Sequence, residues 1–203
     1  MVFDSDMLPN LVLGSSSPYR KELLSRLHLT FITDSPSIDE TPLSQETPEA
    51  LTVRLAREKA LAVHAKHPDS FVIGSDQAAD LNGEILGKPG TKEKAVAQLT
   101  RMQGQKLTFW TAVCVINPAG LAFEALVPTT VEMKTLSQEA ICRYVELENP
   151  VDCAGAAKIE KLGVVLMRRV SSDDPTALIG LPLIQTASLL VKSGYPLLPG
   201  LSE

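Results

Sequence analysis

The chain has 203 residues, of which 44% are hydrophobic and 21% charged, and its formal net charge at pH 7 is −5. This composition is that of an ordinary globular protein of one domain, and it excludes disorder, collagen-like repeats and a disulfide scaffold. The acidic balance argues against binding to a nucleic-acid backbone, and aromatic residues, at 4%, are too few to stack single-stranded bases.

Cysteine usage and the amino-terminal segment indicate the compartment. The three cysteines Cys114, Cys142 and Cys153 show no zinc-like spacing, which is typical of a reduced, cytosolic protein. The first ten residues lack the basic segment and apolar core of a signal peptide. No apolar run approaches the roughly 18 residues that a membrane helix needs. We therefore expect a cytoplasmic protein without a membrane partner.

Apolar periodicity, together with capping and turn residues, predicts alternating strands and helices. Ser17, Thr47, Thr91 and Ser137 each stand where an N-cap is expected, and Asn82-Gly83 is a hairpin-turn signal. The first expected elements, in chain order, are a strand at 11–13, a helix from Pro18, a mostly extended or loop segment at 31–47 and a helix from Pro48. A strand at 70–74 that ends at residues 75–77 follows, and then a hairpin with arms at 78–80 and 84–86. The remaining elements are a helix from Thr91 to Gly104, strands at 106–116 and 121–134, a helix from Ser137 that ends before Asn149-Pro150, a strand at 163–170 and a helix at 183–191.

This order predicts an α/β protein built around a mixed sheet, with a cleft between two lobes. No internal repeat or linker interrupts the chain, so residues 1–203 are expected to form one domain. The first turn follows directly on the first strand, and the carboxyl ends of strands are where open α/β sheets bind ligands.

That first turn is the earliest candidate for chemistry. Residues Ser15 to Arg20 combine hydroxyl donors, a helix N-terminus and a guanidinium, all of which suit a phosphate group. The same residues are compatible with a capping Ser17 and a solvated Arg20. The segment lacks the GxGxxG pattern, so it is not a dinucleotide-binding fingerprint.

Gly87-Lys88-Pro89 is superficially similar to the end of a P-loop. A P-loop has Ser or Thr after the lysine to hold magnesium, and a glycine where this chain has Asn82. Pro89 and Asn82 therefore exclude the P-loop NTPase interpretation. Lys88 remains either a phosphate-binding lysine or a solvated one.

Acidic residues supply the candidate bases and metal ligands. Asp76 follows the strand at 70–74, at its expected carboxyl end, where a general base or a metal ligand would sit. A turn-capping aspartate fits that position equally well. Asp39-Glu40, in the proline-rich segment, and Glu58-Lys59, on the second helix, are also compatible with plain solvated charge.

Taken in order, the motifs SxSPxR, DE, RLAxEKA, GSDQ, GKP, CAGxxKxE and GLPL resemble those of the Maf family of nucleotide pyrophosphatases. The resemblance extends from Leu11 to about Leu190. It implies an α/β fold similar to inosine triphosphatases, with an elongated mixed sheet and a nucleotide cleft. It also implies hydrolysis of a nucleoside triphosphate to the monophosphate and diphosphate, a divalent cation such as Mg²⁺ or Mn²⁺, and a homodimer.

The resemblance also implies a role for each matching residue. Asp76 would be the general base and, with Glu40, a metal ligand. The triphosphate would be neutralised by Ser15, Arg20, Lys59 and Lys88.

Three further positions, Tyr19, Gln77 and Glu160, would read the base. At positions 77 and 160, Gln77 and Glu160 resemble the residues of the family branch that hydrolyses 7-methyl-GTP. That branch more often has tryptophan at the position of Tyr19. Two alternatives stay open: a pyrophosphatase for dTTP, UTP or a broad set of modified nucleotides, and a nucleotide-sensing regulator of cell division with little catalysis.

Overall fold

Four of the described α-helices begin at a residue whose hydroxyl caps the first turn. The Oγ of Ser17, for example, accepts from the backbone N–H of Arg20, and Thr47 accepts in the same way from Ala50. Thr91 and Ser137 repeat this arrangement. All four predicted caps are therefore confirmed. The helices are α1 (Pro18–Ser25), α2 (Pro48–His64), α3 (Lys92–Met102), α4 (Gln138–Glu148) and α5 (Leu183–Lys192), with short 3₁₀ helices η2 (Ala154–Ala156), η3 (Leu162–Leu166) and η4 (Ala177–Ile179).

The computed structural model describes residues 8–198 and 200. The first seven residues, part of the segment in which no signal peptide was expected, lie outside the described residues. None of the helices within the described part is both long enough and apolar enough to span a bilayer.

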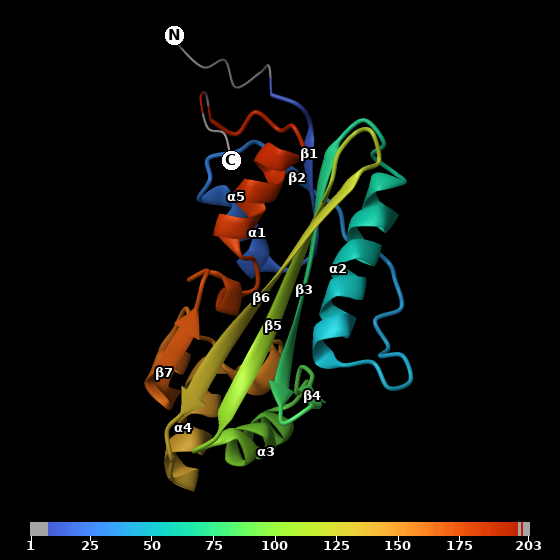
Figure 1. Ribbon diagram of the computed structural model, residues 1–203. Helices are drawn as coiled ribbons and strands as arrows, with labels where there is room; N and C mark the ends of the chain where they lie inside the picture. Colours follow the sequence, from blue (N-terminus) through green and yellow to red (C-terminus); the bar gives the residue numbers. More distant parts are fainter. Residues whose placement is uncertain (1–7, 199, 201–203) are drawn as a thin grey trace.

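A seven-stranded mixed sheet extends along the molecule (Figure 1). Its order is β2-β1-β3-β5-β6-β7, with β4 paired to β3. β2, β1 and β3 are parallel to one another, whereas all other pairs are antiparallel. The mixed α/β fold expected from the sequence is thus confirmed. The strands are β1 (Leu11–Gly14), β2 (Ile32–Thr33), β3 (Phe71–Leu81), β4 (Glu84–Leu86), β5 (Lys106–Ile116), β6 (Ala122–Met133) and β7 (Met167–Ser172).

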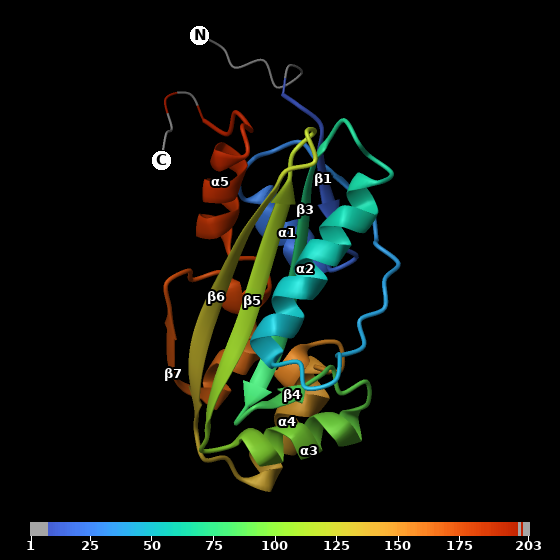
Figure 2. The same cartoon turned by 45° about the vertical axis from the view of Figure 1, so that its right-hand side comes forward.

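Alternation along the central strands separates three clusters of core side chains. On one face, Ile73 and Val115 belong to the cluster that packs under α1 and α5, while Phe109 belongs to the cluster at the α3 and α4 end. On the opposite face, Val72 packs against the apolar side of α2. Figures 1 and 2 show α2 alone along one side and the two helix pairs at opposite ends of the sheet.

Two predicted elements differ from the structure. The strand expected to end at Gly74 continues to Leu81, because its antiparallel pairing with β5 runs from Val72 to Asp80. Asp76 and Gln77 therefore lie within a strand and not at its carboxyl end. The strand expected at 163–170 begins only at Met167, since residues 162–166 form η3.

A glycine sets the distance between α2 and β3. A Cβ added to Gly74 would lie 2.7 Å from the backbone nitrogen of Ala60 and would also crowd the carbonyl oxygen of Ala56. Both neighbours are backbone atoms of a helix and cannot rotate away. Gly74 and the two alanines therefore let the helix approach the strand closely.

We expect Gly74→Ala to lower the free energy of unfolding by roughly 2–3 kcal/mol, because the added methyl group forces α2 away from β3. Denaturant unfolding measures the change. Gly87→Ala is the matched control, since its added Cβ meets nothing within 4 Å. Equal stability of both variants would contradict the close approach.

Candidate active site

The edge of β3 is interrupted between its two partners on one side. β1 pairs with it up to Gly74, and β4 begins to pair at Ala79. Among the residues that the structure describes, none pairs with Ser75–Ala78 on that side of the strand; we call these four residues the notch. Successive side chains there point to opposite faces of the sheet, so a ligand at the notch can be contacted from both.

A cleft of about 530 Å³ lies over the notch. Every site residue expected from the sequence lines it, although they span positions 15 to 160 of the chain. They come from the first turn, the segment before α2, α2 itself, the notch, the β4–α3 loop and the η2–η3 connection. The lining residues of this set are Ser15, Tyr19, Arg20, Glu40, Lys59, Asp76, Gln77, Lys88 and Glu160.

Lys59 is the centre of the charged part of the cleft. Its Nζ lies 2.6 Å from Oδ1 of Asp76 and 2.9 Å from Oε1 of Glu40. Lys59 and Asp76 are both buried, whereas Glu40 is exposed. Their arrangement follows from the fold, because Asp76 points to the α2 face of β3 and Lys59 lies on the buried side of α2.

The surroundings of Asp76 shift its proton affinity in opposite directions. Burial raises the pKa of its carboxyl, while the charges of Lys59 and Arg20 lower it; the net direction is upward. A carboxylate with a raised pKa is a better proton acceptor than an ordinary one, which suits a general base. The partial compensation by two cations keeps the charged form accessible.

Arg20 is anchored to the protein and faces the same charges. Its Nε donates to the carbonyl oxygen of Gly180 at 2.8 Å, and its Nη1 donates to Oγ of Ser15 at 3.4 Å. Burial lowers the pKa of Arg20 and the carboxylates of Asp76 and Glu40 raise it, with a net downward direction. Because a guanidinium keeps its proton in proteins, Arg20 remains a fixed cation with Nη2 still able to bind an anion.

Gln77 points to the other face of β3. Its Nε2 lies 2.9 Å from the carbonyl oxygen of Ala177 and 3.0 Å from Oγ1 of Thr111. These acceptors fix which end of the amide is nitrogen, since a flipped amide would place oxygen against oxygen. The carbonyl oxygen Oε1 is therefore the polar atom of Gln77 suited to contact a ligand.

The far end of the cleft is built on the segment between α4 and η3. Oδ2 of Asp152 accepts from the Tyr19 hydroxyl at 3.4 Å, and Oδ1 of Asp152 lies 3.0 Å from Nζ of Lys158. Burial lowers the pKa of Lys158, but hydrogen bonds to Asp152 and Tyr19 outweigh it, so its net shift is upward. Glu160 is exposed at the same end. Tyr19 thus spans from α1 to the segment that carries Glu160.

Two carboxylates of the cleft, those of Asp76 and Glu40, are candidate ligands for a divalent cation. Within residues 8–198 and 200, no group of three or more His, Cys, Asp or Glu is arranged to hold a metal. Asp76 and Glu40 nevertheless converge on the same nitrogen of Lys59. Mg²⁺ is commonly bound by one or two carboxylates together with substrate phosphates and water. The donors fit a cation that arrives with a phosphate ligand.

Several residues that shape the cleft were not predicted. Oγ of Ser75 donates to the carbonyl oxygen of Gly180 at 3.1 Å, and Thr111 supports Gln77. Asp174 caps α5 from outside the helix, because its Oδ2 accepts from the N–H of Ile184 at 2.7 Å. Asp152 stands one residue before the motif CAGxxKxE, and this position was the available signal in the sequence.

Together these features define a mixed-sheet α/β protein with a cation-lined cleft for an anionic ligand at an interrupted strand edge. The chain belongs to the Maf family: the family described as "Maf-like protein" matches residues 10–193.

Curated relatives match over nearly the full length of both chains. A protein of Xanthomonas campestris pv. campestris is 53% identical over 191 residues, which cover 94% of this chain and 100% of the relative. One from Cupriavidus pinatubonensis is 52% identical over 95% of this chain and 97% of its own length. Both are named "7-methyl-GTP pyrophosphatase". Among solved structures, the Staphylococcus aureus Ham1 protein is similar at a TM-score of 0.46 and 17% identity, over 61% of this chain and 71% of that one.

The ion pair of Lys59 and Asp76 predicts a pH effect. A base at Asp76 loses activity as the pH falls through its pKa. The charge of Lys59 lowers that pKa, so Lys59→Met is expected to raise it and move the acidic limb of kcat/KM to higher pH. The pH profile of nucleotide hydrolysis measures the shift, with exposed Lys106→Met as control. A limb that stays in place would mean that another group titrates.

Proposed function

We propose that this protein hydrolyses 7-methyl-GTP to 7-methyl-GMP and diphosphate, which removes a modified nucleotide from the nucleotide pool. The observation that carries the proposal is the triad of Glu40, Lys59 and Asp76 at the notch, in a chain about half identical to proteins named for this activity. A buried acid held by a lysine beside further cations suits attack on a phosphate anhydride.

Asp76 is the proposed general base. Its Oδ1 is held by Lys59, which leaves Oδ2 to accept a proton from water. The oxygen of that water forms a bond to the α-phosphorus, and the bond from this phosphorus to the oxygen that bridges the α- and β-phosphates breaks. The bridging oxygen leaves with the diphosphate, and the proton stays on Asp76 until it is released to solvent.

The triphosphate is proposed to lie along the cations of the cleft. Arg20, Lys59 and Lys88 neutralise phosphate oxygens, and the Ser15 hydroxyl adds a hydrogen-bond donor. Asp76 and Glu40 would hold Mg²⁺ or Mn²⁺, which supplies positive charge to the phosphate oxygens when it is bound. Such local cations let a chain with a net charge of −5 bind an acidic substrate.

The base is proposed to lie at the Tyr19 end. A 7-methylguanine ring is positively charged, so an aromatic face attracts it by about 0.5–2 kcal/mol. The Glu160 carboxylate can accept from the N1–H and the 2-amino group, and Oε1 of Gln77 can add a further acceptor. Thymine and uracil offer fewer donors to these oxygens, which disfavours the dTTP/UTP alternative.

A second candidate function is nucleotide sensing with little catalysis. A binding protein can retain the cleft without a working base. The close pair of Asp76 and Lys59 favours the enzyme, because a sensor gains nothing from a buried proton acceptor. A coupled assay for released diphosphate in the presence of magnesium distinguishes the two.

We also propose that the protein works in the cytoplasm, as one domain spanning residues 1–203 and as a homodimer. The three free cysteines support a reducing compartment, and the sheet that joins both ends of the cleft supports one domain. The homodimer rests on the family resemblance.

We expect Asp76→Asn to lower kcat by roughly 10²-fold or more, because general-base catalysis is worth that much. Nucleotide affinity, measured by calorimetry, should change far less, since Lys59 and Arg20 remain. Asp69→Asn, on the exposed α2–β3 connection, serves as control. Near-normal turnover would remove Asp76 from the role.

We expect Glu160→Gln to lower the ratio of 7-methyl-GTP to UTP hydrolysis by roughly tenfold or more. It removes a charge-assisted hydrogen bond, worth about 1.5–3 kcal/mol, and offers a new donor to pyrimidine carbonyls. Rates with both nucleotides at equal concentration give the ratio. Glu139→Gln, exposed on α4, should leave it unchanged. A constant ratio, also in the double variant with Gln77→Thr, would contradict this assignment of the base.

A further inference from the structure

Residues 35–46 form an extended segment that leads into α2; we call it the strap. Figure 2 shows it in light blue along the outer side of α2 before it turns into the helix. The structure describes all of these residues, and none of their apolar side chains is fully buried. Even Leu43 is 60% exposed. Because the strap has no fully buried apolar side chain, its position depends largely on polar contacts.

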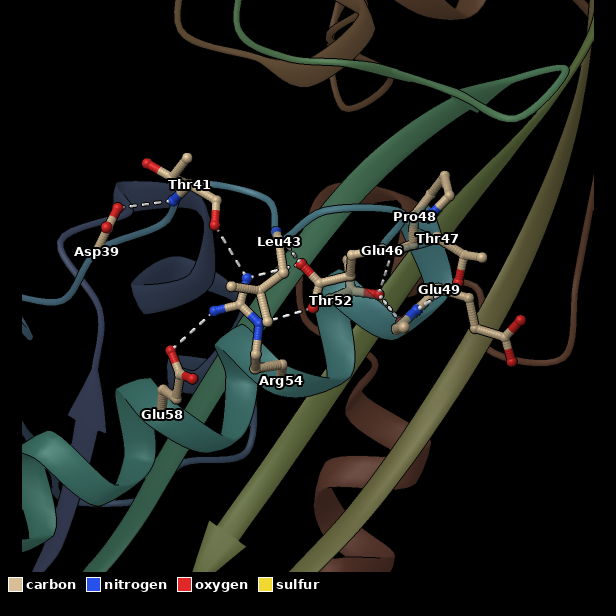
Figure 3. A network of polar contacts seen from close by, with 11 residues as sticks. Asp39, Thr41, Leu43, Glu46, Thr47, Pro48, Glu49, Thr52, Arg54 and Glu58 are labelled. Carbon is tan, nitrogen blue, oxygen red and sulfur yellow. Dashed lines mark hydrogen bonds and ion pairs between the residues drawn. The ribbon is translucent and has the colours of Figure 1, made fainter.

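Most of these contacts converge on Arg54 of α2 (Figure 3). Its Nε lies 2.7 Å from Oε1 of Glu46, and its Nη2 lies 2.8 Å from Oε2 of the same carboxylate. This two-point geometry is the strong form of an arginine–carboxylate pair. The Glu46 side chain is only 8% exposed, and its hydrogen bonds to Arg54 lower its pKa to about 2. The pair is therefore ionised across the physiological range.

The same guanidinium reaches the part of the strap that carries Glu40. Nη2 of Arg54 donates to the carbonyl oxygen of Thr41 at 3.2 Å, and the backbone N–H of Thr41 donates to Oδ1 of Asp39 at 2.9 Å. Glu40 is thus bracketed by two fixed neighbours. Its own carboxylate lies on Lys59, five residues after Arg54 on the same helix. α2 therefore carries both Arg54, which anchors the strap, and Lys59, which pairs with Glu40 of the strap.

We propose that Arg54 is a positioning residue, which fastens the strap to α2 and thereby keeps the Glu40 carboxylate on Lys59 beside Asp76. Its effect on catalysis rests on the proposed function, whereas its effect on the strap does not. Arg54 touches no reacting atom in this proposal. Without it, the strap loses its two-point anchor and its tie at Thr41, and Glu40 samples positions away from the triphosphate.

The first measurement is amide hydrogen exchange. The N–H of Leu43 donates to Oε2 of Glu46 at 2.9 Å, so it reports directly on the anchored strap. Arg54→Met should speed exchange at residues 41–46 by about tenfold or more and leave β3 and β5 unchanged. Arg26→Met is the matched control, because Arg26 makes the same two-point contact with Glu22 on the exposed side of α1. Unchanged exchange in the strap would overturn the proposal.

The second measurement is a double-mutant cycle with Glu40→Gln. Arg54→Met alone should lower kcat/KM for 7-methyl-GTP by roughly 10- to 100-fold, the usual cost of misplaced groups. In the Glu40→Gln background it should have little further effect, since the residue that it positions has already lost its charge. The affinity for 7-methyl-GTP with magnesium, measured by calorimetry in the Asp76→Asn background, should behave in the same way. Arg54→Met should lower this affinity when Glu40 is present and change it little when Glu40→Gln is already in place. Full additivity in both would overturn the proposal.

Two conservative variants keep the test decisive if Arg54→Met does not fold. Arg54→Lys keeps the charge but loses the two-point contact, and Glu46→Gln keeps the side-chain shape but loses the charge. Both should give intermediate exchange rates and intermediate kcat/KM values. If the unmodified protein hydrolysed no nucleotide, the proposed function would fail while the exchange comparison would still decide the role of Arg54 in the strap.

Discussion

The interruption in strand pairing at Ser75–Ala78 is the constraint on which the rest of the site depends. β3 is held by β5 along its whole central length, so the chain there stays straight and ordered even though β1 has ended and β4 has not begun. A regular strand with one free edge presents alternate side chains to two faces at fixed spacing. Asp76 and Gln77 are consequently adjacent in sequence yet serve opposite sides of one cleft. A loop at this position would give neither the spacing nor the rigidity.

The buried ion pair of Asp76 and Lys59 contributes little to the free energy of folding. Desolvation of two charges offsets most of their attraction, and an apolar pair of similar volume is often as stable or more so. A catalytic role explains this buried pair between α2 and β3 better than a structural role does, because carboxyl groups with shifted pKa values concentrate at functional sites. The small residues Gly74, Ala56 and Ala60 support this view. They bring the helix close enough for a lysine on its buried side to reach the strand.

Local sequence signals predicted where the helices begin, but they did not by themselves predict how the residues of the site come together. Caps, hairpin turn and apolar spacing are short-range effects, so the sequence alone placed the starts of α1 to α4. The length of β3 depends on pairing with β5, some 35 residues later, which no local pattern reveals. Lys59 carried an overlooked signal: it stands at helical spacing with Leu55 and Val63, in the stripe that the core buries. Arg54 is the first residue of the motif RLAxEKA, but the motif did not reveal its role, because its partners lie on an irregular segment.

The two ends of the cleft differ in how they are built, and this bears on how specificity can vary. The proposed phosphate end rests mainly on β1, α1, α2 and the notch, which are regular elements joined through the core, while Glu40 and Lys88 come from irregular segments. The proposed base end rests on residues 150–161, an irregular segment with a single 3₁₀ turn, held by Tyr19, Asp152 and Lys158. Changes in that segment can alter which base is bound without moving Asp76 or Lys59. This division of the fold fits a proposed site in which the triphosphate chemistry is constant and the segment that recognises the base can vary.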